Sequence, residues 1–239
     1  MTHKFNELFV IEKPIIGMIH LAGNNSGEKL NRALEEIAIF EEEGIKGAIV
    51  EDYHGTQRDI ENLFNKMKEQ KHGTNLVFGV NLLSNPCYGL ELARKYGIIK
   101  FVQFDNVQDN FTGLPQYLAM RKLEEYGDIL VLGGIRFKYT RPTGKTLEQD
   151  IADGIKRCDA IVTTGEGTGK ETPIEKLREF RKIMKDYPLI VGAGVNAKNV
   201  YEQLSIADGA IVGSFFKNGN TENPIDRKKI KELISQRLS

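Results

Sequence analysis

Short apolar segments alternate with longer amphipathic segments along the whole chain. Eight of the apolar segments are rich in β-branched residues and almost continuously apolar, as expected of strands that are buried on both faces. They are residues 15–21, 48–51, 76–81, 101–104, 129–137, 160–162, 189–191 and 210–212. This pattern predicts eight buried strands.

The segments between these strands are charged and carry apolar residues at helical spacing. They are residues 30–43, 58–70, 86–96, 116–126, 147–157, 173–186, 199–204 and 226–237. Strict alternation of strands and helices implies a parallel sheet, and eight such units favour a closed barrel over an open sheet. We therefore predict a parallel (β/α)8 TIM barrel as a single domain over residues 1–239, with its core at about 13–236.

The overall charge excludes several classes of function. Lys and Arg together number 33, as do Asp and Glu, and no basic stripe stands out. Nucleic-acid binding and a basic membrane-binding surface are therefore not expected. The first residues lack the features of a secretory signal, and no apolar run approaches membrane-spanning length. We expect a cytoplasmic protein without membrane insertion, in which Cys87 and Cys158 are buried thiols.

Glycine follows the last two apolar segments and recurs in the loop after the sixth. Phosphate groups can approach backbone N–H groups most closely where no Cβ intervenes, and barrels commonly bind phosphate at these last loops. We therefore predict that a small phosphorylated metabolite binds here. The predicted contacts are Gly192, Ala193, Gly194, Gly213 and Ser214, with Gly167 and Gly169 nearby.

Two nucleotide-binding motifs are matched only in part. Residues 192–197 fit the pattern GxGxxA, but they lie near the end of the chain, and the next strand ends in Gly213-Ser214 rather than in an acidic residue. Residues 165–170 fail as a phosphate-binding P-loop, because Thr164 replaces the first glycine and Glu171 replaces the metal-binding hydroxyl. We therefore predict no nucleotide cofactor.

Polar side chains stand at the carboxyl ends of the first five predicted strands. Such side chains converge on one cavity in a barrel. The candidates for catalysis are His20, Glu51, Asn81, Asp105 and Lys138. Each also has an ordinary structural explanation, such as an ion pair or a helix cap. His20, Glu51 and Asp105 could ligate a metal ion, but no spacing motif supports one, so no metal site is predicted.

Two reactions are compatible with these groups. In an isomerase or epimerase, Glu51 or Asp105 would remove a proton next to a carbonyl, and Lys138 or His20 would stabilise the enediolate. In an aldolase-type lyase, Lys138 would form a Schiff base with the substrate. Barrels often dimerise. The pair Phe215-Phe216 could belong to the core, to a pocket wall or to a dimer interface, so a homodimer is one of the alternatives.

Eight short blocks of the sequence form a recognisable series from about residue 13 to residue 230. They are residues 17–21 (GMIHL), 50–52, 79–83, 159–162, 165–170, 192–195, 207–213 and 223–226. These blocks, in the same order, resemble the BtpA family of photosystem I biogenesis proteins. The resemblance implies a TIM barrel of the ribulose-phosphate-binding kind.

The family resemblance adds a third hypothesis and two departures. The family label suggests a non-enzymatic assembly factor or a metabolite-binding scaffold. Against the usual family pattern, Tyr139 replaces a histidine, and residues 103–105 replace Arg-Val-Asn with Gln-Phe-Asp. A lost arginine and a gained carboxylate change the charge of the expected pocket, which implies a substrate that differs from that of the relatives.

Overall fold

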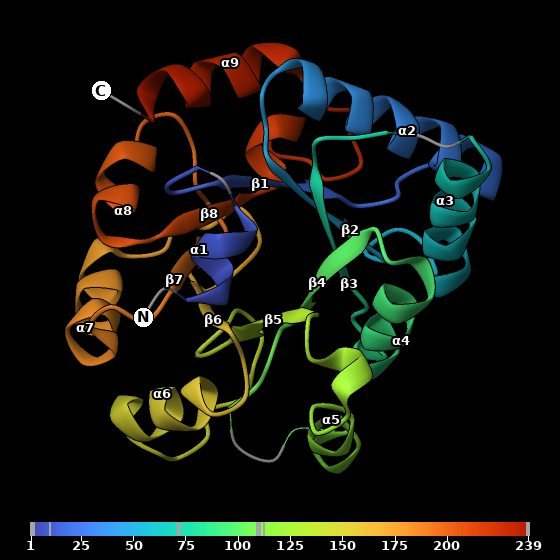
Figure 1. Cartoon of the computed structure of the whole chain (residues 1–239). Coiled ribbons are helices and arrows are strands. Elements are labelled where there is room, and N and C mark those ends of the chain that lie inside the picture. The colour runs from blue at the N-terminus through green and yellow to red at the C-terminus, as the bar shows by residue number, and fades with distance from the viewer. Residues whose placement is uncertain (1–2, 10, 71–72, 109–110, 112, 238–239) are drawn as a thin grey trace.

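Eight parallel strands form a closed barrel in the computed structural model, which describes residues 3–9, 11–70, 73–108, 111 and 113–237 (Figure 1). Neighbours in sequence are neighbours in the sheet, and β1 pairs with β8 to close the ring. The strands are β1 (Ile15–Ile19), β2 (Gly47–Glu51), β3 (Val77–Asn81), β4 (Ile99–Phe104), β5 (Leu130–Gly134), β6 (Ala160–Thr164), β7 (Leu189–Gly192) and β8 (Gly209–Val212). The predicted TIM barrel is confirmed.

Helices follow each strand and surround the ring. They are α2 (Ser26–Glu42), α3 (Gln57–Glu69), α4 (Pro86–Tyr96), α5 (Leu114–Met120), α6 (Leu147–Ile155), α7 (Ile174–Met184), α8 (Val200–Ile206) and α9 (Arg227–Gln236). Local sequence explains several helix starts. Thr56 and Asp59 form a reciprocal capping box at α3, and Pro86 occupies the first turn of α4.

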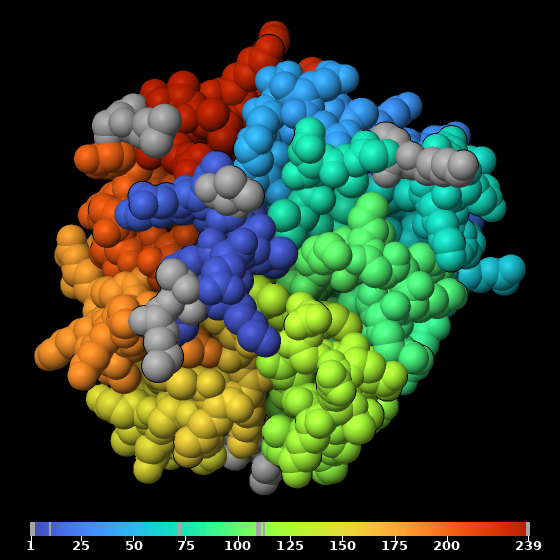
Figure 2. All heavy atoms as spheres, in the orientation of Figure 1, coloured from blue at the N-terminus to red at the C-terminus, as the bar shows by residue number. Residues whose placement is uncertain are grey.

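A short helix, α1 (Lys4–Leu8), covers the amino-terminal end of the barrel, where it lies over the middle of the ring in Figures 1 and 2. Phe5 and Phe9 belong to the apolar cluster inside the barrel, and the Phe9 ring lies 6.1 Å from that of Phe101. A Cβ at Gly47, the first residue of β2, would meet the Phe9 ring at 2.9 Å. Helix α1 therefore closes the end opposite to the strands' carboxyl ends.

Several elements differ from the sequence prediction. The predicted strand 129–137 ends at Gly134, because Arg136 turns the chain with a φ of 47°. The predicted helix 116–126 divides into α5 and a 3-10 turn at Glu124–Tyr126. Helix α1 and a second 3-10 turn, η2 (Ser214–Lys217), were not predicted, because they are too short for a periodic pattern.

The remaining structural expectations concern burial. Cys87 and Cys158 are both buried, as predicted. Phe216 is buried against Phe40, whereas Phe215 is only half-buried. Phe216 thus belongs to the core, and the homodimer stays a prediction. Among the described residues, no helix combines the length and apolar character needed to cross a membrane.

Candidate functional site

Four predicted residues meet at the carboxyl ends of β1 to β4. Asn81, the last residue of β3, donates one hydrogen bond to Glu51 (2.7 Å) and one to Asp105 (3.1 Å). Asp105 also accepts a hydrogen bond from the Gln103 amide at 2.8 Å. The His20 Nε2 atom lies 4.0 Å from the Glu51 Oε2 atom. One amide therefore links two carboxyl groups, with an imidazole beside them.

Burial changes the acidity of both carboxyl groups. It raises the pKa of Glu51 to about 8, with a further contribution from the negative charge of Asp105, while Lys138 and Asn81 oppose the shift. Burial also raises the pKa of Asp105, although hydrogen bonds from Gln103 and Asn81 favour its ionised form. Glu51 is therefore a carboxyl group whose two protonation states are both populated near neutral pH.

The His20 ring lacks the partners that a buried imidazole normally has. Burial, and then the positive charge of Lys217, hold its pKa well below the usual value, so the ring is neutral. Among the described residues, neither His20 Nδ1 nor Gln103 Oε1 has a hydrogen-bond partner, although both atoms are buried. Both residues line the same cavity. Unpaired buried polar atoms are costly, so their presence here favours a functional explanation.

The glycine-rich loops after β6, β7 and β8 meet on the other side of the cavity. Gly194 has a φ of 67°, and a Cβ there would lie 2.3 Å from the backbone nitrogen of Glu171. A Cβ at Gly213 would lie 2.8 Å from the His20 ring, and one at Gly169 would lie 3.2 Å from the Ser214 Oγ atom. Glycine is therefore required where these loops touch each other and the imidazole.

Six of the seven predicted phosphate contacts line this cavity. They are Gly169, Gly192, Ala193, Gly194, Gly213 and Ser214. Ala193 adopts a φ of 61°, an uncommon conformation for a residue with a side chain. Gly167 is not among the lining residues and instead lies beside Tyr139, since a Cβ there would be 3.2 Å from the phenol oxygen. The structure thus gathers the predicted set except for Gly167.

Lys138 and Tyr139 hold the loop after β6 in place. The Lys138 ammonium donates a hydrogen bond to the Thr168 hydroxyl (3.1 Å), and the Thr168 backbone N–H donates to the Tyr139 phenol oxygen (3.1 Å). The Lys138 backbone N–H donates to the Thr164 hydroxyl at 2.6 Å. Tyr139 is 76% exposed, so its ring lies over the loop rather than inside the protein.

The cavity between the two groups of residues is small, about 50 Å³. Pockets that enclose a small organic molecule usually measure about 300–1,000 Å³. The loop after β6, which is bonded to Lys138 and Tyr139, forms part of the cavity wall through Thr168 and Gly169. In this structure the cavity is therefore smaller than a typical metabolite site.

Sequence reasoning missed three residues of this site. Gln103 orients Asp105, and Thr164 and Thr168 bond to Lys138. The departure from the family pattern at residues 103–105 was the available signal for Gln103. Threonine side chains near strand ends are too common to stand out. Within the described part of the chain, no three His, Cys, Asp or Glu side chains gather closely enough to hold a metal ion.

Comparison with protein-family models gives a match to the BtpA family over residues 11–238. The chain belongs to the BtpA family. An uncharacterised protein of Pyrococcus furiosus is 28% identical over 95% of this chain and 96% of its own length. Photosystem I biogenesis protein BtpA of Synechocystis is 27% identical over 95% of this chain and 89% of its own length.

Two of the solved structures with a similar fold are named as enzymes. N-(5'-phosphoribosyl)anthranilate isomerase from Pyrococcus furiosus aligns with a TM-score of 0.60 and 18% identity, over 95% of this chain and 98% of its own. Orotidine 5'-phosphate decarboxylase from Pyrococcus horikoshii aligns with a TM-score of 0.63 and 14% identity, over 94% and 99%. At such low identity, the likeness extends to the TIM-barrel fold alone.

Proposed function

We propose that this protein binds a small sugar phosphate at the carboxyl end of the barrel and isomerises or epimerises it by proton transfer. The observation that carries this proposal is Glu51, a buried carboxyl group with a pKa raised to about 8 that faces a cavity with glycine loops in its opposite wall. A general acid or base works best when its pKa lies near the working pH. Two neighbours of the same fold are named for phosphorylated compounds, which supports this substrate class.

In the proposed reaction, the ionised form of Glu51 removes a proton from the carbon next to the substrate carbonyl. The C–H bond breaks, an O–H bond forms on Glu51, and the electron pair moves onto the carbonyl oxygen. The Lys138 ammonium, which also lines the cavity, stabilises the resulting negative charge. In an isomerisation, Glu51 then returns the proton to the former carbonyl carbon, while the hydroxyl proton of the neighbouring carbon passes to the enediolate oxygen. In an epimerisation, a proton from water reaches the other face of the same carbon, and Glu51 releases its own proton to the solvent.

Phosphate binding would take place on the opposite side of the cavity. Backbone N–H groups at residues 192–194 and 213–214, together with the Ser214 hydroxyl, are the proposed donors. Binding energy from the phosphate could hold the reacting carbons against Glu51 and offset the cost of moving the loop after β6. Asn81 and Gln103 would keep the carboxyl groups oriented.

Solvent-deuterium incorporation tests the proton transfer. Sugar phosphates that raise the melting temperature of the protein, when their dephosphorylated forms do not, are incubated with it in D2O and examined by mass spectrometry. We expect one deuterium at a carbon next to the carbonyl, and none with Glu51→Gln. If a bound sugar phosphate gains no deuterium, the proposed proton abstraction is wrong.

Lys138 keeps a second reaction open, because its side chain lines the same cavity. As a Schiff-base nucleophile it would support aldol cleavage. Borohydride added with the substrate should then increase the intact mass of the wild type but not that of Lys138→Met. A protein that binds sugar phosphates and gives neither deuterium exchange nor a trapped adduct would fit the scaffold hypothesis.

A further inference from the structure

A second, larger cavity lies beside the proposed site. Its volume is about 780 Å³, within the range of pockets that hold small organic molecules. It is lined by the segment after β5 (residues 136–145), the start of the loop after β6, Asp150 of α6 and Lys176 of α7. None of the proposed phosphate contacts lines it, so the proposed function leaves this cavity unexplained.

Positive side chains outnumber negative ones in the wall of this cavity. The cations are Arg136, Lys138, Arg141, Lys145 and Lys176, and the carboxylates are Asp150 and Glu166. Asp150 is already occupied, because it accepts hydrogen bonds from Arg136 (3.0 Å) and from the Thr143 hydroxyl (2.8 Å). Lys145 is likewise paired with Asp153 (2.9 Å), so the remaining surplus of positive charge comes from Lys138, Arg141 and Lys176 against Glu166.

Lys176 is a half-buried cation of this wall. Its ammonium donates hydrogen bonds to the backbone carbonyls of Arg136 (2.8 Å) and Thr164 (2.6 Å), so both partners are neutral. Burial, and then the positive charge of Arg136, lower the pKa of Lys176 to about 8, and the carboxylate of Glu166 opposes this shift. One N–H of the ammonium is left for a ligand, and an anion would stabilise the charged form.

The two cavities lie side by side. Phe137, Lys138 and Thr164 line both of them. The hydrogen bond from the Lys138 backbone N–H to the Thr164 hydroxyl joins the segment after β5 to the last residue of β6 in this shared wall. The larger cavity has enough volume to hold a ligand without the smaller one.

We propose that the larger cavity is a second binding site, for a small organic anion whose phosphate or carboxylate group contacts Lys176. The apolar residues of the lining indicate the chemistry of the rest of the ligand. Phe137, Tyr139, Pro142 and Pro173 offer flat apolar surfaces, which favour an aromatic or other planar group next to the acid. Tyr139 and Lys138 also bond to Thr168 in the loop after β6. A ligand in the larger cavity would therefore change how firmly this loop is held over the smaller cavity, which we call the inner site.

Calorimetric titration with phenyl phosphate and with benzoate tests this second site. We expect wild type to bind at least one of the two probes, and Lys176→Met to weaken that binding by about tenfold or more. Lys182→Met, the same change on the same helix outside the cavity, should bind as wild type does. Inorganic phosphate as a third probe measures how much the planar group contributes. A comparison of the two organic probes distinguishes a phosphate from a carboxylate site.

A variant of the inner site separates this inference from the proposed function. Ser214→Asp should weaken sugar-phosphate binding by about tenfold or more and leave phenyl phosphate or benzoate binding intact. The inference is overturned if wild type binds neither probe, if Ser214→Asp rather than Lys176→Met abolishes the binding, or if Lys176→Met equals Lys182→Met. Melting temperatures show that each variant is folded, and Lys176→Arg, which keeps the charge, should restore part of the affinity.

Discussion

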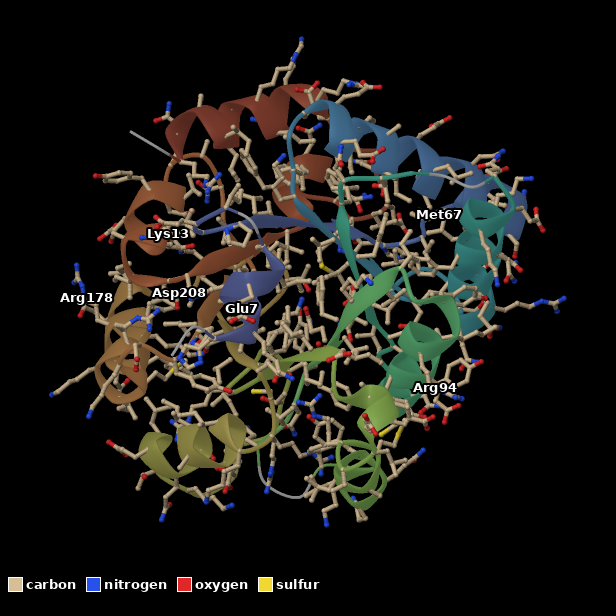
Figure 3. All side chains as sticks on the ribbon, in the orientation of Figure 1. Glu7, Lys13, Met67, Arg94, Arg178 and Asp208 are labelled. Carbon is tan, nitrogen blue, oxygen red and sulfur yellow. The ribbon has the colours of Figure 1, made fainter. Side chains whose placement is uncertain are left out.

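At the amino end of the barrel, carboxylates are paired with positive charges, whereas at the carboxyl end burial opposes the charged forms of several side chains. At the amino end, Asp159 and Asp208 stand just before β6 and β8. Asp159 accepts hydrogen bonds from the Val131 backbone N–H and from Arg121, and Asp208 does the same with Leu189 and Arg181. Figure 3 labels Asp208 and Lys13 on this face. Both carboxylates are therefore paired. Asp159 joins the start of β6 to β5 and to Arg121 at the end of α5, and Asp208 joins the start of β8 to β7 and to α7.

At the carboxyl end, His20, Glu51 and Asp105 are held where burial opposes their charged forms. A structure selected only for stability would not gather such groups around a cavity, since each one costs free energy. At the amino end the paired carboxylates favour stability, whereas the carboxyl end holds the buried groups on which the proposed function rests. The following changes test this division, from the largest expected effect to the smallest.

Glu51→Gln should have the largest effect. We expect deuterium incorporation into the bound sugar phosphate to fall by about 10²–10⁴-fold, because the amide keeps the shape but can neither take nor give the proton. Glu35→Gln, at an exposed position on α2, is the matched control and should leave the exchange rate unchanged. A rate that survives in Glu51→Gln would assign the proton transfer to another group.

Asp208→Ala should act on stability and leave the chemistry intact. It removes the acceptor of the Leu189 N–H and of Arg181, so we expect the free energy of unfolding to fall by about 1–3 kcal/mol. Urea denaturation measures this loss, and the exchange rate of the folded protein should equal that of wild type. An unchanged stability would show that the paired end of the barrel does not carry the role assigned to it.

Ser214→Asp should weaken sugar-phosphate binding by about tenfold or more, because it places a negative charge where the phosphate is expected. Ser205→Asp makes the same change at an exposed position on α8 and should bind as wild type does. Isothermal titration with the stabilising sugar phosphate measures both. Equal affinities in the two variants would place the phosphate elsewhere.

Tyr139→Phe should have the smallest effect. It removes the acceptor of the Thr168 N–H at an exposed latch, so we expect about a two- to threefold loss in sugar-phosphate affinity. Hydrogen exchange of the Thr168 amide should become faster, while Tyr201→Phe on α8 leaves it unchanged. Unaltered exchange in Tyr139→Phe would mean that the phenol does not hold this loop.

Periodicity along the sequence was sufficient to predict the fold, and the candidate site was then expected at the carboxyl ends of the strands. Buried strands and amphipathic helices leave a strong signal, and glycines after β7 and β8 mark close backbone contacts. The pKa of Glu51 could not be predicted, because it depends on burial and on Asp105, which is distant in sequence. The latch through Thr168 and the exclusion of Gly167 from the cavity also depend on how loops meet in space.

Some of the blocks that resemble the family contain residues at the amino end of the barrel. The blocks at residues 159–162 and 207–213 contain Asp159 and Asp208, whose bonds stabilise the amino end of the barrel. The block at residues 17–21 instead leads to His20, at the opposite end. A motif in a sequence therefore does not reveal which end of the barrel it serves, and the three-dimensional position of each residue decides its role.

The most direct test is the titration of Glu51 by ¹³C NMR of its carboxyl carbon, assigned by comparison with Glu51→Gln. The account predicts a midpoint near pH 8. This pKa exceeds the ordinary value of 4.5, so the folded protein retains a proton that the unfolded chain loses. Wild type should therefore lose stability as the pH rises from about 4.5 to 8, by up to about 1 kcal/mol per pH unit relative to Glu51→Gln. A midpoint near 4.5, with parallel stability profiles, would contradict the account.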